Sequence, residues 1–253
     1  MEADFSTFVL YVLVGFLAQL IDGALGMAYK VSSNTFLLSM GIPPGMASAS
    51  VHIASIFTSL VSGLSHLKFG NVDKRLVLKL MVPGMIGGAT GAYLLAKVLD
   101  GEKVVPYIAA YLLIMGVVII FKSFNNQEHH RRFRKRLVLP LGFTGGFMDS
   151  IGGGGWGPIV TTTLISTGHP PRKSIGSVNL AEFFVTAIVS FTFLLTLGLM
   201  KNWVNVAGLM LGEVAAAPLG AMLTRRLPLR WMMLAVGLMI VFISIRTLVL
   251  ALF

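Results

Sequence analysis

Long apolar runs, separated by short polar or glycine-rich breaks, limit the possible folds of this chain more than any other feature. Hydrophobic residues make up 55% of the sequence and charged residues only 12%, whereas a soluble domain has about 25% charged residues. Runs of about 20 apolar residues suit helices that cross a bilayer core of about 30 Å. The sequence therefore predicts an all-α polytopic membrane protein.

The positive charge is concentrated in loops. The net charge is +10, and much of it lies in the stretch EHHRRFRKR at 128–136. Basic loops of this kind are typical of the cytoplasmic side of membrane proteins, so nucleic acid is not expected as a partner. Zero cysteines exclude thiolate metal sites, and His129 and His130 lack a third ligand. We therefore expect no metal and no cofactor. No catalytic or nucleotide-binding motif is present, so an enzyme is not expected.

The two halves of the chain resemble each other at an offset of 127 residues, the separation of Asp22 and Asp149. Further matches in this register are Gly15 with Gly142, Gly26 with Gly153, Gly41-x-Pro43-Pro44 with Gly168-x-Pro170-Pro171 and, after a two-residue adjustment, Gly91 with Gly220. This number of matches indicates an internal duplication. We predict a first transmembrane repeat at 1–122, a basic linker at 123–136 and a second repeat at 137–253.

Each repeat divides into five apolar segments at Gly, Pro or charged residues. They are expected at about 5–24, 30–41, 45–66, 75–98 and 104–122, and at 137–151, 157–168, 174–198, 203–224 and 231–252. The second segment of each half spans only about 18 Å, too little to cross a bilayer. The first two segments of each half are therefore expected to be short helices, or a re-entrant hairpin, around a glycine turn.

Counting Lys and Arg in the loops predicts the orientation. An odd number of crossings per half puts nearly all the basic loops in the cytoplasm and both termini outside, as the positive-inside rule requires. Two halves that enter from opposite faces form an inverted repeat. In secondary transporters of this architecture, substrate sites lie near the midplane where helices are interrupted.

The stretch DSIGGGGWGP at 149–158 interrupts the second repeat at that depth. A helix starting near Pro158 points unpaired N–H groups at the glycines, which favours an anion. The candidate substrate-binding residues here are Gly152, Gly153, Gly154, Gly155, Trp156, Thr161 and Thr162. The alternative is a tight turn that needs glycine only for its backbone angles.

The matching turn of the first repeat has no glycine run and instead carries Lys30, with Ser33 and Asn34 after it. A lysine at membrane depth needs a charged partner or ligand. Lys30 is a candidate for binding an anionic substrate; alternatively it extends to the cytoplasmic surface, or pairs with Asp22 or Glu182.

Ionisable and polar residues inside the apolar runs are further candidates, because each is costly there. His52 aligns with Asn179, and both are assigned to the substrate site. His52 and Glu182 suit proton coupling, and Asp22 and Asp149 are included with them. Glu213 also interrupts an apolar run. For all of these the alternative is a structural hydrogen bond, ion pair or helix cap.

The glycine-rich turn with Pro158, the two GxPP motifs and the loop HLKFGNVD at 66–73 together resemble the TauE/SafE family of membrane permeases. The resemblance covers nearly the whole chain. It implies export of sulfite or small organosulfonates such as sulfoacetate across a bacterial inner membrane, with the glycine motif at Gly152–Gly155. The first half retains only Gly23 and Gly26 and gains Lys30. This predicts an asymmetric site, to which one half contributes backbone donors and the other a charge.

The expected partners are therefore a small sulfur-containing anion and the lipid bilayer, with a homodimer left open. Two alternatives on the same scaffold are an anion channel and an uptake permease for related anions.

Overall fold

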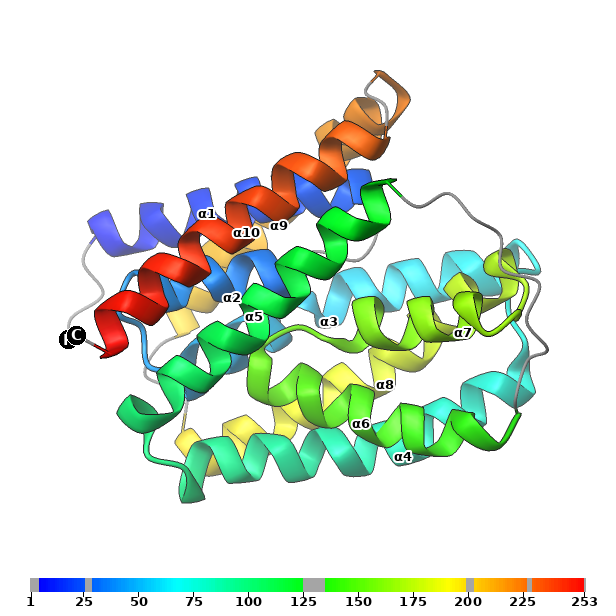
Figure 1. Cartoon of the computed structure of the whole chain (residues 1–253), viewed down its shortest axis with the longest axis horizontal. Coiled ribbons are helices and arrows are strands. Elements are labelled where there is room, and N and C mark those ends of the chain that lie inside the picture. Colours follow the sequence, from blue (N-terminus) through cyan, green and yellow to red (C-terminus); the bar gives the residue numbers. More distant parts are fainter. Residues whose placement is uncertain (1–4, 26–28, 125–134, 199–202, 227–228, 253) are drawn as a thin grey trace.

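A computed structural model describes residues 5–25, 29–124, 135–198, 203–226 and 229–252. Within these residues the chain forms ten α-helices, with short 3₁₀ and π segments and no strand. In Figure 1, α3, α4 and α6 run close to the long axis of the molecule, and α5 and α10 are inclined to it. The expected all-helical architecture is confirmed.

The helices follow the segments predicted from the apolar runs. The first half contains α1 (Phe5–Leu25), α2 (Tyr29–Ser39), α3 (Pro44–Lys68), α4 (Lys74–Tyr93) with the π-helix η1 (Leu94–Val98), and α5 (Gly101–Phe124). The second half contains the 3₁₀ turn η2 (Lys135–Leu137), α6 (Val138–Gly152), the π-helix η3 (Trp156–Thr161) continued by α7 (Thr162–Ser166), α8 (Pro171–Leu197), α9 (Trp203–Arg226) and α10 (Leu229–Leu252). The linker predicted at 123–136 lies mostly outside the described residues.

Five helices in the described part of the chain are long and apolar enough to cross a membrane: Pro44–Lys68, Lys74–Val98, Lys103–Phe124, Arg172–Leu197 and Met233–Leu252. By contrast, α2 has 11 residues, about 16 Å at 1.5 Å per residue. The 15 residues of α6 cover about 22 Å. The 21 residues of α1 cover about 31 Å. In the first half, therefore, only the second helix is short, and the expectation of two short helices holds only in the second half.

Both GxPP motifs end one helix and begin the next. Gly41 and Gly168 adopt left-handed backbone angles, with φ of 77° and 91°, which glycine reaches without a steric cost. The second proline of each motif is the first residue of α3 or α8, where its missing N–H is harmless. This geometry turns α2 into α3, and α7 into α8.

Glycines set the closest helix contacts. A Cβ on Gly15 of α1 would collide with the carbonyl oxygen of Leu209 on α9, and a Cβ on Gly142 of α6 would collide with that of Leu80 on α4. The pairs α1–α9 and α4–α6 are the most extensively packed helix pairs, and α5–α10 and α3–α8 come next. In Figure 1, α5 and α10 run in opposite directions.

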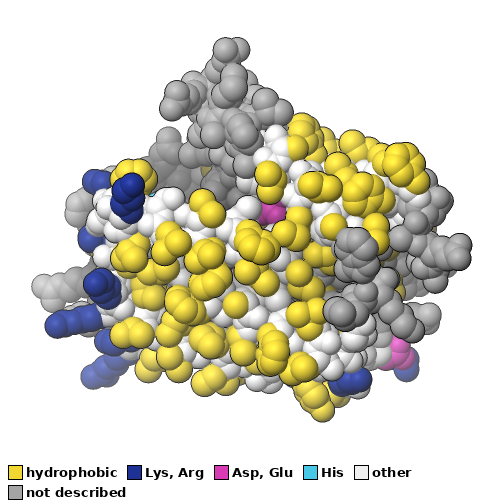
Figure 2. Space-filling view, turned by 180° about the vertical axis from the view of Figure 1, so that it is seen from behind, with side chains coloured by type: hydrophobic (Ala, Val, Ile, Leu, Met, Phe, Trp, Pro, Cys, Tyr) yellow, Lys and Arg dark blue, Asp and Glu magenta, His cyan; other side chains and the backbone are white. Residues whose placement is uncertain are grey.

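The two ends of the molecule differ in charge. Where α3 and α4 meet the start of α8, the basic side chains are Lys68, Lys74, Arg75, Lys79, Arg172 and Lys173; we call this the basic end. In Figure 2, Lys and Arg side chains gather along one end and the band between the ends is largely apolar. The first residue of α1 and the last of α10 lie at the opposite end (Figure 1).

Candidate functional site

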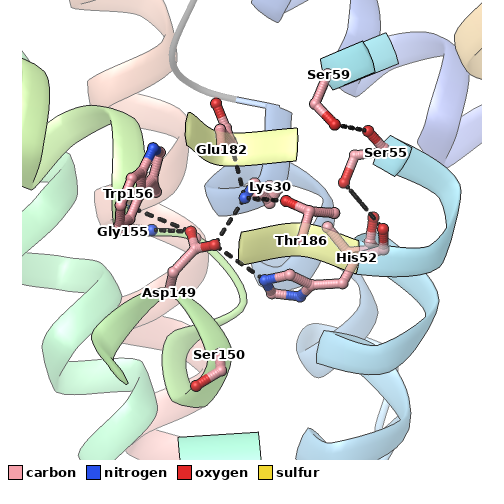
Figure 3. A network of polar contacts seen from close by, with 12 residues as sticks. Lys30, His52, Ser55, Ser59, Asp149, Ser150, Gly155, Trp156, Glu182 and Thr186 are labelled. Carbon is pink, nitrogen blue, oxygen red and sulfur yellow. Dashed lines mark hydrogen bonds and ion pairs between the residues drawn. The ribbon is translucent and has the colours of Figure 1, made fainter. Parts of the chain in front are cut away.

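Asp149, near the end of α6, is the centre of a buried polar network (Figure 3). Its side chain is 0% exposed. Oδ1 accepts hydrogen bonds from the backbone N–H groups of Gly155 and Trp156, at 2.8 and 3.0 Å. These donors stand at the start of η3, so the carboxylate caps the helix that follows the glycine run. The helix begins at Trp156, two residues before the predicted Pro158.

Lys30 brings α2 into the same network. Its Nζ lies 2.7 Å from Asp149 Oδ2, 2.8 Å from Glu182 Oε1 and 3.3 Å from Thr186 Oγ1. An ammonium group has three N–H donors, and these three acceptors can use all of them. Lys30 is only 8% exposed, while Glu182 is 18% exposed. Of the alternatives considered for Lys30, the structure shows pairing with Glu182, to which it adds Asp149.

His52 on α3 completes the network. Its Nε2 lies 3.0 Å from Asp149 Oδ2, and its Nδ1 lies 2.8 Å from the carbonyl oxygen of Ser48. Asp149, when ionised, accepts from Nε2–H, while Nδ1 has two partners, the Ser48 carbonyl and, at 3.3 Å, the Ser48 hydroxyl. The network thus joins two carboxylates, Asp149 and Glu182, to one ammonium group and one imidazole ring.

The glycine run packs tightly against α2 and α5. Gly153 has a φ of 64°, and a Cβ there would collide with the amide of Asn34. Asn34 Nδ2 donates to the carbonyl oxygen of Gly152 at 2.6 Å, and Tyr111 Oη donates to that of Gly154 at 2.9 Å. A Cβ on Gly154 would collide with the backbone where Lys30 joins Val31. The missing side chains therefore allow α2 to approach closely and place Lys30 beside Asp149.

A cavity of about 330 Å³ opens beside this network. Its polar lining includes Gln19, Lys30, Ser55, Thr58, Ser59, Ser62, Asp149, Asn179, Glu182 and Glu213. His66 and Ile175, near the end of α3 and the start of α8, also line it, so it extends toward the basic end. At about 30 Å³ per water molecule, the space is ample for a small anion.

The residues selected from sequence divide into three groups. Those that line the cavity are Lys30, Asp149, Gly154, Gly155, Thr161, Asn179 and Glu182. His52 is not in the cavity lining but contacts Asp149, which is. Those that lie outside its wall are Ser33, Asn34, Gly152, Gly153, Trp156 and Thr162. The side chain of Asp22 lies outside the described residues. The backbone donors expected to face a ligand are those of Gly155 and Trp156, which bind Asp149 here.

Two further residues outside the wall, Trp156 and Thr162, also have structural contacts. The indole Nε1 of Trp156 donates to the carbonyl oxygen of Val178 at 3.1 Å, and its ring packs against Gly84 of α4. The hydroxyl of Thr162 donates to the carbonyl oxygen of Pro158. Both contacts fix the segment after the glycine run against its neighbours.

Several site residues were not selected from sequence. Thr186 lies one turn after Glu182 on α8, and Tyr111 lies on α5; neither belongs to any motif. A signal did exist on α3, where Ser55, Thr58, Ser59 and Ser62 repeat at i, i+3, i+4 and i+7. That spacing places four hydroxyls on one helix face, and all four line the cavity.

Comparison with known proteins gives a consistent result. The profile of the family described as "Sulfite exporter TauE/SafE" matches residues 11–247. The chain is 41% identical over 248 residues to "Probable membrane transporter protein YtnM" of Bacillus subtilis, covering 95% of this chain and 82% of that protein. It is 19% identical over 264 residues to "Probable membrane transporter protein YunE" of the same organism, covering 94% and 96%. No solved structure matches the chain.

Proposed function

Because the chain belongs to the TauE/SafE family of membrane transporters, we propose that it exports sulfite or a small organosulfonate across a bacterial inner membrane. The family profile bears the description of a sulfite exporter, while the two relatives are described only as transporters. One observation carries the proposal: a lysine at the wall of a cavity is held by two carboxylates that differ in exposure.

This difference suggests how an anion binds. Asp149 is fully buried and is fixed by two backbone N–H groups. Glu182 lines the cavity and is 18% exposed. A sulfite or sulfonate group has a negative charge and three acceptor oxygens, so it can replace Glu182 at Lys30 Nζ. Asn179 and Thr161, in the same wall, offer further donors.

The glycine contacts support an inverted repeat. The duplication aligns Gly15 with Gly142 and, after the two-residue adjustment, Leu80 with Leu209. The close approach of Gly15 to Leu209 is thus the counterpart of that of Gly142 to Leu80. The alignment therefore matches the packing of α1 against α9 with the packing of α6 against α4. Transporters with such halves bind substrate at their interface, where the cavity lies.

The position of the cavity gives a cytoplasmic substrate access to the site, as export requires. The basic end is the cytoplasmic end by the positive-inside rule, and the cavity extends toward it. Substrate would then reach Lys30 from the cytoplasm. The first residue of α1 and the last of α10 lie at the opposite, external end in this orientation.

Counterflow tests the substrate class. Purified protein in liposomes loaded with unlabelled sulfite should accumulate radiolabelled sulfite, with sulfoacetate, taurine and sulfate tested as competitors. Lys30→Ala removes a charge-assisted contact of about 1.5–3 kcal/mol, so we expect counterflow to fall by about tenfold or more. Lys103→Ala is the control, because Lys103 is 83% exposed at the opposite end.

Three outcomes contradict the proposal. Full counterflow in Lys30→Ala rejects the anion site. Steady single-channel currents indicate a channel, and transport only toward the cytoplasm indicates an uptake permease.

We further propose that protons drive export through Glu182 and His52. Their contacts with Lys30 and Asp149 support this, because protonating Glu182 or deprotonating His52 changes the charge of the network. A pH gradient should accelerate transport in the wild type and have little effect in Glu182→Gln and His52→Ala. An equal response to the gradient in all three proteins rules out this coupling.

A further inference from the structure

Glu213 is a second buried carboxylate in the wall of the same cavity. It lies near the middle of α9, with Leu209 and Gly212 on one side and Ala216 on the other, all buried. Its side chain is 1% exposed. An ionisable group at this depth is costly unless it has a function or a partner. The network around Lys30 does not include it.

The contact between Glu213 and Thr58 can accommodate the carboxylate in either protonation state. Thr58 Oγ1 on α3 lies 2.6 Å from Glu213 Oε1 and 3.1 Å from the carbonyl oxygen of Ser55. A hydroxyl has one proton to donate, and the carbonyl can only accept. If Glu213 is ionised, Thr58 donates to it. If Glu213 is protonated, it donates to Thr58, and the hydroxyl turns toward Ser55. The same short contact fits both protonation states.

We propose that Glu213 is a proton-binding site of the transporter, with Thr58 as the hydroxyl that adapts to its charge. A proton from water in the cavity binds the carboxylate, changing its charge from −1 to 0, and is later released to water. The assignment of this proton to the coupling of transport rests on the proposed transport function. The binding of the proton itself does not depend on that function.

The surroundings of Glu213 include other titratable groups. The cavity wall contains Tyr29 and Lys30 from α2, His66 from α3, Asp149 from α6 and Glu182 from α8. Helix α1, which packs against α9, contributes Gln19. On α3, Ser59 donates to the carbonyl oxygen of Ser55, and Ser55 to that of His52 (Figure 3). Ser55 also donates to the carbonyl oxygen of Val51 at 2.8 Å, and Ser55 and Ser59 both line the cavity that Glu213 shares with Asp149.

Infrared difference spectroscopy of the purified protein tests the proton site directly. Acidification should produce C=O bands of protonated carboxylic acids, and one component of these bands should be missing in Glu213→Gln but present in Glu182→Gln. The control Asp100→Asn, at the exposed opposite end, should retain it. In Thr58→Val, the ionised Glu213 loses the hydrogen bond from the Thr58 hydroxyl. The proton concentration at which half of Glu213 is protonated should therefore change by about tenfold. Thr58→Ser should restore it.

Acid-induced C=O bands that are the same in Glu213→Gln and wild type, or a midpoint that is the same in Thr58→Val and wild type, overturn the assignment. Sodium ions that shift the carboxylate bands of wild type but not of Glu213→Gln, with no effect of acid, would show a cation site instead. In liposomes, the ratio of sulfite accumulation with and without a pH gradient should fall to about one in Glu213→Gln. If wild type transports no anion, the proposed function fails, while the spectra still decide whether Glu213 binds a proton.

Discussion

A single side chain, Asp149, holds three parts of the site together. One carboxylate oxygen caps the helix after the glycine run, and the other contacts Lys30 and His52. The backbone donors that a glycine-rich turn offers to an anion are therefore filled by the protein's own carboxylate. Lys30 and the more exposed Glu182 are left to face the cavity.

Loss of Asp149 should destabilise the protein more than loss of Glu182. Removing one partner of a buried ion pair costs about 3–5 kcal/mol, because the other charge is left buried. Asp149→Asn should therefore lower the thermal unfolding midpoint in detergent clearly, and Glu182→Gln much less. Equal midpoints for the two variants would show that Asp149 has no special role in anchoring the site.

Gly153→Ala should also be destabilising. A left-handed backbone costs a residue with a Cβ about 1–2 kcal/mol, and here the Cβ would in addition collide with Asn34. Gly70→Ala is a matched control, because its φ is 67° but a Cβ added there would have no atom within 4 Å. Thermal unfolding should show the larger loss for Gly153→Ala. The same loss in both variants would mean that the contact with α2 contributes nothing.

At the scale of elements, α4 and α6 depend on glycine for their close contact. A Cβ on Gly87 would collide with the carbonyl oxygen of Phe143, which is backbone and cannot easily move aside. Gly87→Ala should therefore lower the unfolding midpoint, since overpacking costs about 1–3 kcal/mol. At Gly101 the nearest atom to a new Cβ is 3.8 Å away, so Gly101→Ala should be mild. A mild effect of Gly87→Ala would contradict the described packing.

The helices were predictable from sequence because each has its own local signal. Apolar runs gave the segments, and Gly41, Gly168 and the prolines after them gave the turns. The site was predictable only residue by residue. Lys30, His52, Asp149 and Glu182 are each conspicuous inside apolar runs, but their mutual contacts arise from packing of four helices. Thr186 and Tyr111 carried no signal, since one hydroxyl in an apolar helix has many structural uses.

For the whole molecule, the charge difference between the ends predicts the orientation in the membrane. The chain has no cysteine, so single cysteines can be introduced without a background. In intact spheroplasts, an impermeant maleimide should label Lys103→Cys and leave Lys74→Cys unlabelled until the membrane is opened. Both positions are solvent-exposed in the structure. The reverse labelling pattern would invert the orientation and, with it, the side of the membrane toward which the cavity extends.

The central claim is that a substrate anion takes the place of Glu182 at Lys30. A structure determined with bound sulfite or sulfoacetate tests it most directly. We predict the anion beside Lys30 Nζ, with Glu182 displaced from its 2.8 Å contact. Asp149 should still cap Gly155 and Trp156. An anion bound elsewhere, with the contact between Lys30 and Glu182 intact, would contradict the account.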